Sequence, residues 1–218
     1  MRAEVAGLPA RERDVRIEGS VFRMVVPDAW EKTLCRETLV AGEDPNEPPY
    51  WVHLWPGEKV LARRLLACGG WPGERVLELG CGLGLAGLVA ARLGSRVTLV
   101  DRVHEALAFA RESARSIGVR PCFVRSDLGR LGLRGGFRGV LAAEVAYGPA
   151  EARALAENLA RLLAPGGTGL CADSVRVHDP DFERRCSELG LETSREWVRE
   201  EDDDGRPVWV RLVEVGRP

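Results

Sequence analysis

Hydrophobic and polar positions change their spacing near the middle of the chain, across a loop of alternating glycines. An apolar run over residues 76–79 is typical of a short parallel strand that is buried on both faces. Over residues 85–93, leucine and valine recur at the spacing of a helix. Gly80, Gly82 and Gly84 separate the two patterns. The sequence therefore predicts a strand, a tight turn and the start of a helix, where a ligand can approach the glycine backbone closely.

The same alternation of apolar runs and helical spacing continues to the end of the chain. It predicts an open α/β sheet whose strands are connected by helices. The further strands are expected at residues 96–101, 122–125, 139–143, 168–172, 191–198 and 208–215. The further helices are expected near Pro56 and at residues 103–117, 151–163 and 182–189.

The first part of the chain has a different pattern. Residues 15–26 form two alternating runs around a Gly-Ser turn, and this predicts a β-hairpin outside the main sheet. Residues 41–49 form a polar, proline-rich loop. A length of 218 residues is typical of one domain. We therefore expect residues 1–48 to be an extension of hairpin and loop, and residues 49–218 to be a single structural unit.

The glycine loop fits two kinds of cofactor. Gly82, Gly84 and Gly87 satisfy the GxGxxG pattern of dinucleotide-binding folds, and Asp101 follows at about the 20-residue spacing of that pattern. Glu78, however, lies at the mouth of the loop, where a carboxylate would repel a pyrophosphate and attract a cation. S-adenosylmethionine carries an ammonium and a sulfonium group and no phosphate. The charge of Glu78 therefore favours that cofactor, since an ordinary exposed charge is not expected in so apolar a strand.

The sequence VLELGCGLG at residues 76–84 resembles motif I of the class I S-adenosylmethionine-dependent methyltransferases. This resemblance implies a Rossmann-like, seven-stranded, mostly parallel sheet with helices on both faces and an antiparallel last strand. It also implies that Gly80, Cys81 and Gly82 surround the methionine end of the cofactor. Glu78 would then help to hold the amino group of the cofactor, directly or through water.

The segment before this loop is rich in aromatic residues. It reads PYWVHLWPGEKVLARRLL at residues 49–66 and includes Tyr50, Trp51 and Trp55. Aromatic residues of this kind can simply fill a core. The segment also resembles the corresponding region of the seven-β-strand lysine methyltransferases, above all those that methylate the β subunit of the electron-transfer flavoprotein. That resemblance implies that Trp55 lies beside the cofactor, and it gives no such role to His53.

Acidic residues follow the second and third predicted strands of the main sheet. Asp101 lies where a carboxylate can accept hydrogen bonds from both ribose hydroxyls, a role that is compatible with capping the next helix. Arg102 beside it could pack near the adenine. In class I methyltransferases an acid after the third strand binds the adenine amino group and its neighbour contacts the ring, and Asp127 and Leu128 match these positions. Ala143, at the end of the fourth strand, completes the expected cofactor site.

Candidate acceptor-binding residues follow the fourth strand. Residues 144–147 read EVAY and resemble the motif of an acid, two further residues and a tyrosine in the seven-β-strand lysine methyltransferases. The resemblance makes Glu144 and Tyr147 the candidate catalytic residues. An amine must be neutral to attack, and a carboxylate favours its charged form, so we assign Glu144 to binding and aligning the amine. Tyr147 would form one side of the acceptor site or donate a hydrogen bond. In the alternative interpretation, Glu144 caps the next helix and Tyr147 packs.

A competing motif lies at residues 48–50, which read Pro-Pro-Tyr. Methyltransferases that act on exocyclic amines of bases or on glutamine carry Asn or Asp before such a motif, and that side chain holds the target amine. Glu47 occupies the position here, and the segment precedes the glycine loop instead of following it. We therefore leave this segment out of the predicted acceptor site.

Composition and charge limit the partners. A net charge of −2 and a pI near 6.0 give no basic surface for nucleic acid or for an anionic membrane. No apolar run is long enough to span a bilayer, so we expect a cytoplasmic protein. The 6 cysteines and 3 histidines form no metal-binding pattern, so we expect reduced thiols and no bound metal. The acidic residues 200–205 predict a solvated hairpin tip or, alternatively, a surface for a basic protein.

Together these patterns predict a monomeric S-adenosylmethionine-dependent N-methyltransferase whose acceptor is a protein lysine. A small-molecule amine on the same fold is the first alternative acceptor. A dinucleotide-dependent oxidoreductase and a cofactor-binding module without activity are the two alternatives from other functional classes.

Overall fold

The computed structural model describes residues 4–28, 49–174, 181–203 and 205–218. Its main sheet has 7 strands in the order β6-β5-β4-β7-β8-β10-β9. In chain order these strands are β4 (Arg75–Leu79), β5 (Arg96–Asp101), β6 (Cys122–Arg125), β7 (Phe137–Ala143), β8 (Leu163–Ser174), β9 (Glu192–Glu201) and β10 (Pro207–Gly216). All the strands expected from the apolar runs are present, so the periodicity located them correctly.

The direction of the strands confirms the predicted fold class. Neighbouring strands from β6 to β8 pair in parallel, as expected when each connection crosses over through a helix. The last strand, β10, lies between β8 and β9 and is antiparallel to both. The sheet is therefore the Rossmann-like, mostly parallel sheet with an antiparallel last strand.

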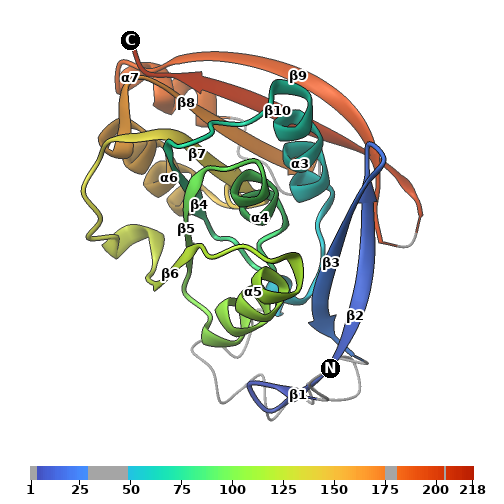
Figure 1. The fold of residues 1–218 in the computed structure, drawn as a ribbon. Helices are drawn as coiled ribbons and strands as arrows, with labels where there is room; N and C mark the ends of the chain where they lie inside the picture. The colour runs from blue at the N-terminus through green and yellow to red at the C-terminus, as the bar shows by residue number, and fades with distance from the viewer. Residues whose placement is uncertain (1–3, 29–48, 175–180, 204) are drawn as a thin grey trace.

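Helices cover both faces of this sheet (Figure 1). They are α3 (Pro56–Cys68), α4 (Leu85–Arg92), α5 (His104–Ile117), α6 (Pro149–Leu162) and α7 (Phe182–Glu188), with short 3₁₀ turns η1 (Tyr50–Val52) and η2 (Leu128–Arg130). Buried side chains of α3, α4 and α5 form one hydrophobic cluster on one face. Those of α6 and α7 form a second cluster on the other face. Each face of the sheet is apolar, which explains why its strands read as continuous apolar runs.

The N-terminal strands form a separate small sheet, as predicted. It consists of β1 (Glu4–Val5), β2 (Leu8–Ile17) and β3 (Ser20–Pro27) in antiparallel order. The turn between β2 and β3 lies one residue earlier than expected, at Glu18 and Gly19, which both have positive φ values. Two adjacent residues in this conformation are typical of a type I′ hairpin turn.

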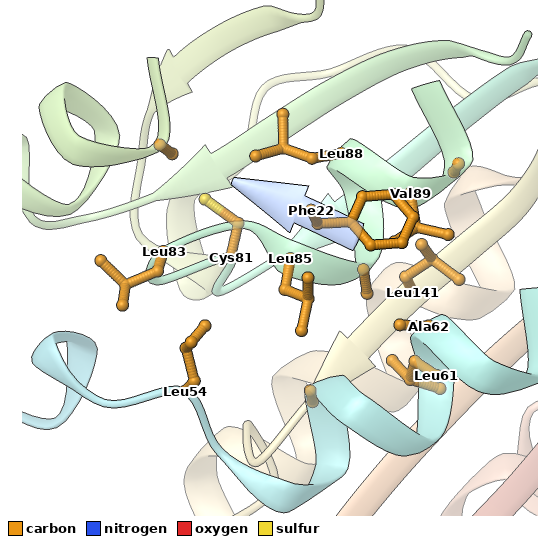
Figure 2. Packing of buried hydrophobic residues seen from close by; sticks show 14 of the residues in the cluster. Phe22, Leu54, Leu61, Ala62, Cys81, Leu83, Leu85, Leu88, Val89 and Leu141 are labelled. Carbon is orange, nitrogen blue, oxygen red and sulfur yellow. The ribbon is translucent and has the colours of Figure 1, made fainter. Parts of the chain in front are cut away.

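This hairpin packs against the helices of the main domain (Figure 1). The backbone N–H of Val25 in β3 donates to Ser113 Oγ in α5 at 2.8 Å. Phe22 is buried in the same cluster as Val89 of α4, and Figure 2 shows the two side chains together. The guanidinium of Arg92 lies over the Phe22 ring at 4.8 Å. The predicted boundary at residue 48 lies outside the described residues.

The acidic residues lie at the exposed tip of the β9–β10 hairpin, as expected, and ion pairs also join this tip to its surroundings. Strand β9 continues to Glu201, and the Glu200 carboxylate accepts from Arg63 of α3 at 2.7 Å. The Asp203 carboxylate receives two hydrogen bonds from Arg13 of β2, both at 3.0 Å. The basic partners come from distant parts of the chain, so the local run of acids gave no sign of them.

The sequence led us to expect no disulfide, no bound metal and no membrane-spanning segment, and the structure bears on these expectations only for the described residues. Five cysteines lie among the described residues, and all of them carry free thiols, whereas Cys35 lies outside. Within the described ranges, histidine, cysteine and acidic side chains form no group of three that could hold a metal ion. His178 is not described. None of the helices in the described ranges is both long and apolar enough to cross a membrane.

Candidate cofactor and acceptor site

The predicted site residues come together at one edge of the sheet. Strands β4 to β7 are parallel, so their carboxyl ends all meet this edge. The glycine loop follows β4, Asp101 ends β5, Asp127 follows β6, and Glu144 follows β7. The sequence therefore placed each of these residues at the correct end of its strand.

The loop after β4 needs its glycines for their backbone conformation. Gly80, Gly82 and Gly84 have φ values of +61°, +50° and +80°, which side-chain-bearing residues rarely adopt. A Cβ atom at Gly80 would also lie 2.9 Å from a methyl group of Val145. Cys81 lies between them, fully buried, with its side chain among those shown in Figure 2. The loop is therefore compact and presents backbone to the site.

Two of the predicted acids, Glu78 and Asp101, accept hydrogen bonds from the backbone of this loop and of the helix that follows it. The Glu78 side chain is 1% exposed, and its Oε2 accepts a hydrogen bond from the Gly87 N–H at 3.0 Å. Asp101 Oδ2 accepts from the Gly82 N–H at 2.8 Å, and its Oδ1 accepts from the Val103 N–H at 2.9 Å. Asp101 thus ties the loop to Val103, the N-cap residue of α5, without occupying the N-cap position itself. A carboxylate has about four acceptor positions, and at Asp101 the backbone N–H groups of Gly82, Val103 and Arg102 use three of them.

A third acid, Glu58 in the first turn of α3, was missed by the sequence reasoning. It is 3% exposed and accepts a hydrogen bond from the backbone N–H of Leu85, the first residue of α4. An acid in the first turn of a helix is common, because it interacts favourably with the helix dipole. The residue therefore looked ordinary in sequence, and only the packing of α3 against α4 brings it to the loop.

The three carboxyl groups are difficult to ionise together. Burial raises the pKa of Glu78 to about 8, and the nearby Asp101 carboxylate adds to this increase. Burial also raises the pKa of Glu58 well above its usual range, with a further contribution from Glu78, and it raises the pKa of Asp101. A ligand that brings positive charge would stabilise the ionised forms. The site is therefore suited to a cation.

The same contacts remove the usual anion-binding property of a helix start. In phosphate-binding loops the first free N–H groups of the helix point at the ligand. Here the N–H groups of Leu85 and Gly87 already donate to Glu58 and Glu78. A pyrophosphate would find carboxylates at this position in place of free donors.

The remaining predicted cofactor residues lie along the same edge. Asp127 is exposed, and its Oδ1 accepts from the Gly129 N–H at 2.7 Å at the start of η2. Leu128 is partly buried against the cluster of α6 and α7. Arg102 follows Asp101, and Ala143 is buried at the end of β7.

Glu144 lies in a strained and buried position after β7. Its φ is +56°, unusual for a residue with a side chain. Oε1 accepts from the Gly57 N–H at 3.1 Å, and Oε2 accepts from the backbone N–H and the hydroxyl of Ser174 at 2.9 and 3.0 Å. The alternative in which Glu144 caps the following helix is wrong, because no side chain in the described ranges caps α6. Glu144 instead joins the start of α3 to the end of β8.

A second buried acid beside Glu144 was also missed. Asp173 is 1% exposed and accepts hydrogen bonds from the backbone N–H groups of Val145 and Ala146. The guanidinium of Arg211 lies 3.8 Å from its Oδ2. Burial raises the pKa of Asp173 to about 7, Glu144 adds to this, and Arg211 opposes it. The predicted strand ended at residue 172, so Asp173 gave no signal as a residue of the site.

The aromatic residues divide into core and rim. Trp51 packs on Phe109 of α5, with ring centroids 5.6 Å apart, so the core interpretation holds for it. Tyr50 and Tyr147 are each 46% exposed, and their rings lie 6.3 Å apart. Trp55 lies 6.1 Å from Tyr50 and donates its indole N–H to the Tyr50 carbonyl at 2.8 Å. Tyr50, Trp55 and Tyr147 therefore form an aromatic rim. This rim is connected to Glu144 along the chain, because Tyr147 follows Glu144 by three residues and Gly57, which donates to Glu144, follows Trp55 by two.

Comparisons with known proteins bear on the activity of this edge. A protein family described as a methyltransferase domain matches residues 76–167. A ubiquinone biosynthesis O-methyltransferase of Caulobacter sp. (strain K31) is 38% identical over 154 residues, which cover 67% of this chain and 59% of the relative. A protein N-lysine methyltransferase of Danio rerio is 33% identical over 127 residues, which cover 54% of this chain and 56% of the relative. The chain thus spans less than two thirds of the length of these relatives.

Solved structures share the fold at low sequence identity. The Thermus thermophilus 16S rRNA methyltransferase RsmC, in complex with AdoMet and guanosine, superposes with a TM-score of 0.70 at 19% identity and covers 96% of this chain and 51% of that chain. The magnesium protoporphyrin IX methyltransferase ChlM of Synechocystis, with bound SAM, superposes with a TM-score of 0.61 at 20% identity and covers 84% of this chain and 90% of that chain. The expected fold is confirmed, and both of these neighbours hold the expected cofactor, whereas the relatives and neighbours differ in their acceptors. Residues 76–167 therefore match a methyltransferase domain, and the chain has the class I fold that these S-adenosylmethionine-bound neighbours share.

Proposed function

We propose that this protein transfers the methyl group of S-adenosylmethionine to the side-chain amine of a lysine in a protein. The carboxylates around the glycine loop carry the cofactor half of this proposal, and the aromatic rim beside Glu144 supports the acceptor half. The residues proposed to surround the cofactor are Trp55, Glu78, Gly80, Cys81, Gly82, Asp101, Arg102, Asp127, Leu128 and Ala143.

The acids at the loop support S-adenosylmethionine over a dinucleotide. Glu58, Glu78 and Asp101 surround one short stretch of backbone, and the first N–H groups of α4 donate to two of them. An ammonium and a sulfonium group gain electrostatic energy in such a place, whereas a pyrophosphate loses it. A dinucleotide-dependent oxidoreductase is therefore the weaker alternative.

The rim supports an acceptor with a cationic head on an apolar arm. Tyr50 and Tyr147 present exposed rings that can pack along the methylenes of a lysine and interact with its ammonium. Glu144 accepts hydrogen bonds from Gly57 and Ser174, which hold its carboxylate in one orientation beside the rim. A carboxylate that is fixed in this way would align the amine before transfer.

Methyl transfer then requires little beyond positioning. The neutral amine attacks the methyl carbon, a C–N bond forms, the S–C bond breaks, and its electron pair leaves with sulfur to give S-adenosylhomocysteine. A lysine side chain in water has a pKa of about 10.4, so it must release a proton before the attack, and that proton leaves to water. Holding the two reactants in line supplies most of the acceleration in such a step. Glu144 and Tyr147 act as positioning groups for the acceptor.

Transfer of labelled methyl groups would test the acceptor. The protein is incubated with S-adenosylmethionine carrying a tritiated methyl group and with a cell lysate separated into protein, RNA and small-molecule fractions. We expect label in protein that is recovered as methyl-lysine after hydrolysis. Label confined to small solutes would instead support the small-molecule alternative, for which the ubiquinone-related relatives are the precedent.

Two variants of Tyr147 sharpen this test. Replacement by phenylalanine keeps the ring and removes the hydroxyl, whereas replacement by alanine removes both. If the ring forms the acceptor wall, Tyr147→Ala should raise the KM for the acceptor severalfold while Tyr147→Phe should not. Both variants should bind S-adenosylhomocysteine as the wild type does. Loss of cofactor binding in Tyr147→Ala would place the residue at the cofactor instead.

A further inference from the structure

Glu58 has an unusual position for a side chain with no assigned role. It lies in the first turn of α3, it is 3% exposed, and one carboxylate oxygen accepts from the Leu85 N–H. Its Oε2 is buried and has no hydrogen-bond partner among the described residues. A buried acceptor without a donor costs about 1–3 kcal/mol, so this oxygen is a place where a ligand can bind with gain.

The surroundings of Glu58 show which charge the ligand would carry. The charged groups that raise the pKa of Glu58 are acids, chiefly Glu78 and then Asp203 and Glu144, which all disfavour its ionisation. Within the ranges that the structure describes, no lysine, arginine or histidine forms an ion pair with it. A buried carboxylate of this kind is stabilised by a cation that also donates hydrogen bonds.

The glycine loop passes next to Glu58. If Gly82 carried a Cβ atom, that atom would lie 3.5 Å from Glu58 Oε1, in ordinary contact. Gly82 therefore presents only backbone to the carboxylate, which lies beside the loop proposed to contact the cofactor. Glu78, which was expected to hold the amino group of the cofactor, accepts a hydrogen bond from the Gly87 N–H through its Oε2.

We propose that Glu58 binds the α-ammonium group at the methionine end of S-adenosylmethionine and so positions the cofactor on the glycine loop. This inference rests on the proposed function. The ammonium is the suitable group because it donates hydrogen bonds, whereas the sulfonium has no N–H or O–H to donate. Glu78, which is buried next to the loop, then contributes to cofactor binding through its negative charge.

Two nucleosides that differ only at the methionine end provide the test. S-adenosylhomocysteine carries the ammonium, and 5′-methylthioadenosine lacks the whole amino-acid portion. Glu58→Gln keeps the volume of the side chain and an oxygen for the Leu85 N–H, but it replaces the free carboxylate oxygen by an NH₂ group. By isothermal titration calorimetry, we expect Glu58→Gln to weaken S-adenosylhomocysteine at least tenfold and 5′-methylthioadenosine less than twofold.

A control variant tests whether weakening another contact of α3 is enough to change nucleoside binding. Glu200→Gln removes the charge from the contact between β9 and Arg63 of α3 and should bind both nucleosides as the wild type does. An equal loss of both nucleosides in Glu58→Gln, or unchanged binding of S-adenosylhomocysteine, would overturn the inference. If Glu58→Gln does not fold, Glu58→Asp decides the question, because the shorter carboxylate should weaken S-adenosylhomocysteine selectively.

The outcome also separates this inference from the proposed function. A wild-type protein that binds neither S-adenosylhomocysteine nor S-adenosylmethionine would overturn both. A wild type that binds S-adenosylhomocysteine, together with a Glu58→Gln variant that binds it equally well, would overturn only the role of Glu58.

Discussion

Replacing Glu78 by glutamine should change how the stability of this protein depends on pH. The side chain is 1% exposed under the glycine loop, and burial raises its pKa to about 8 from an ordinary value of 4.5. Between these two values the folded protein keeps the proton that the unfolded chain has released. Unfolding therefore releases a proton in this range, and a rise in pH favours the unfolded state.

The size of the effect follows from the same two values. A single group that is protonated in the folded state and ionised in the unfolded state lowers the free energy of unfolding by about 1.4 kcal/mol for each pH unit. Between pH 5.5 and 7.5 the contribution of Glu78 should thus amount to about 3 kcal/mol. Glutamine does not titrate, and its amide oxygen can still accept from the Gly87 N–H. The variant should therefore gain stability relative to the wild type as the pH rises.

Urea denaturation without cofactor at several pH values would measure this difference. Other buried acids such as Asp173 also change stability with pH, so the quantity of interest is the difference between Glu78→Gln and the wild type at each pH. Glu157→Gln, on the exposed side of α6, is the matched control and should give a constant difference. A constant difference for Glu78→Gln as well would show that Glu78 does not hold a proton under the loop, and the reasoning from its raised pKa would fail.

Three further predictions concern neighbouring contacts. Gly87→Ala should lower the free energy of unfolding by roughly 1–3 kcal/mol in urea titrations, because its Cβ atom would lie 2.3 Å from a leucine methyl group of β5. Gly132 has open space around it, so Gly132→Ala should leave the free energy of unfolding unchanged. Arg13→Ala removes the paired hydrogen bonds to Asp203 and should cost at most about 1 kcal/mol, less in high salt, since the pair is partly exposed. Asp101→Ala should weaken S-adenosylhomocysteine roughly tenfold or more in calorimetry, and an unchanged affinity would contradict its place at the ribose.

The order of elements could be predicted because each signal was local. An apolar run gives a buried strand wherever it lies in the chain, and the glycines at residues 80–84 mark where the first parallel strand turns into a helix. The carboxyl ends of parallel strands share one edge, so the acids Asp101, Asp127 and Glu144 could be placed at one site before any contact was known. The fold and the approximate position of the site thus follow from pattern alone.

The contacts of the individual acids could not be predicted in this way. Glu58 reaches the loop only because α3 packs on α4, and Asp173 reaches the segment after β7 only because β8 continues past residue 172. Glu200 finds Arg63 across 137 residues of sequence. Each of these partners is set by how elements pack in space, and a single sequence carries no record of that packing.

The start of α3 links the two halves of the site. Gly57 and Glu58 are consecutive, and the first donates its N–H to Glu144 while the second accepts from the N–H of Leu85 in α4. One rigid helical turn therefore fixes the carboxylate proposed for the acceptor and the carboxylate proposed for the cofactor. A Cβ atom at Gly57 would lie 2.4 Å from the Ala172 carbonyl oxygen, so this close approach of the turn to the sheet requires glycine. Because a methyl transfer depends on the distance between donor and acceptor, this shared turn would set that distance in the proposed reaction.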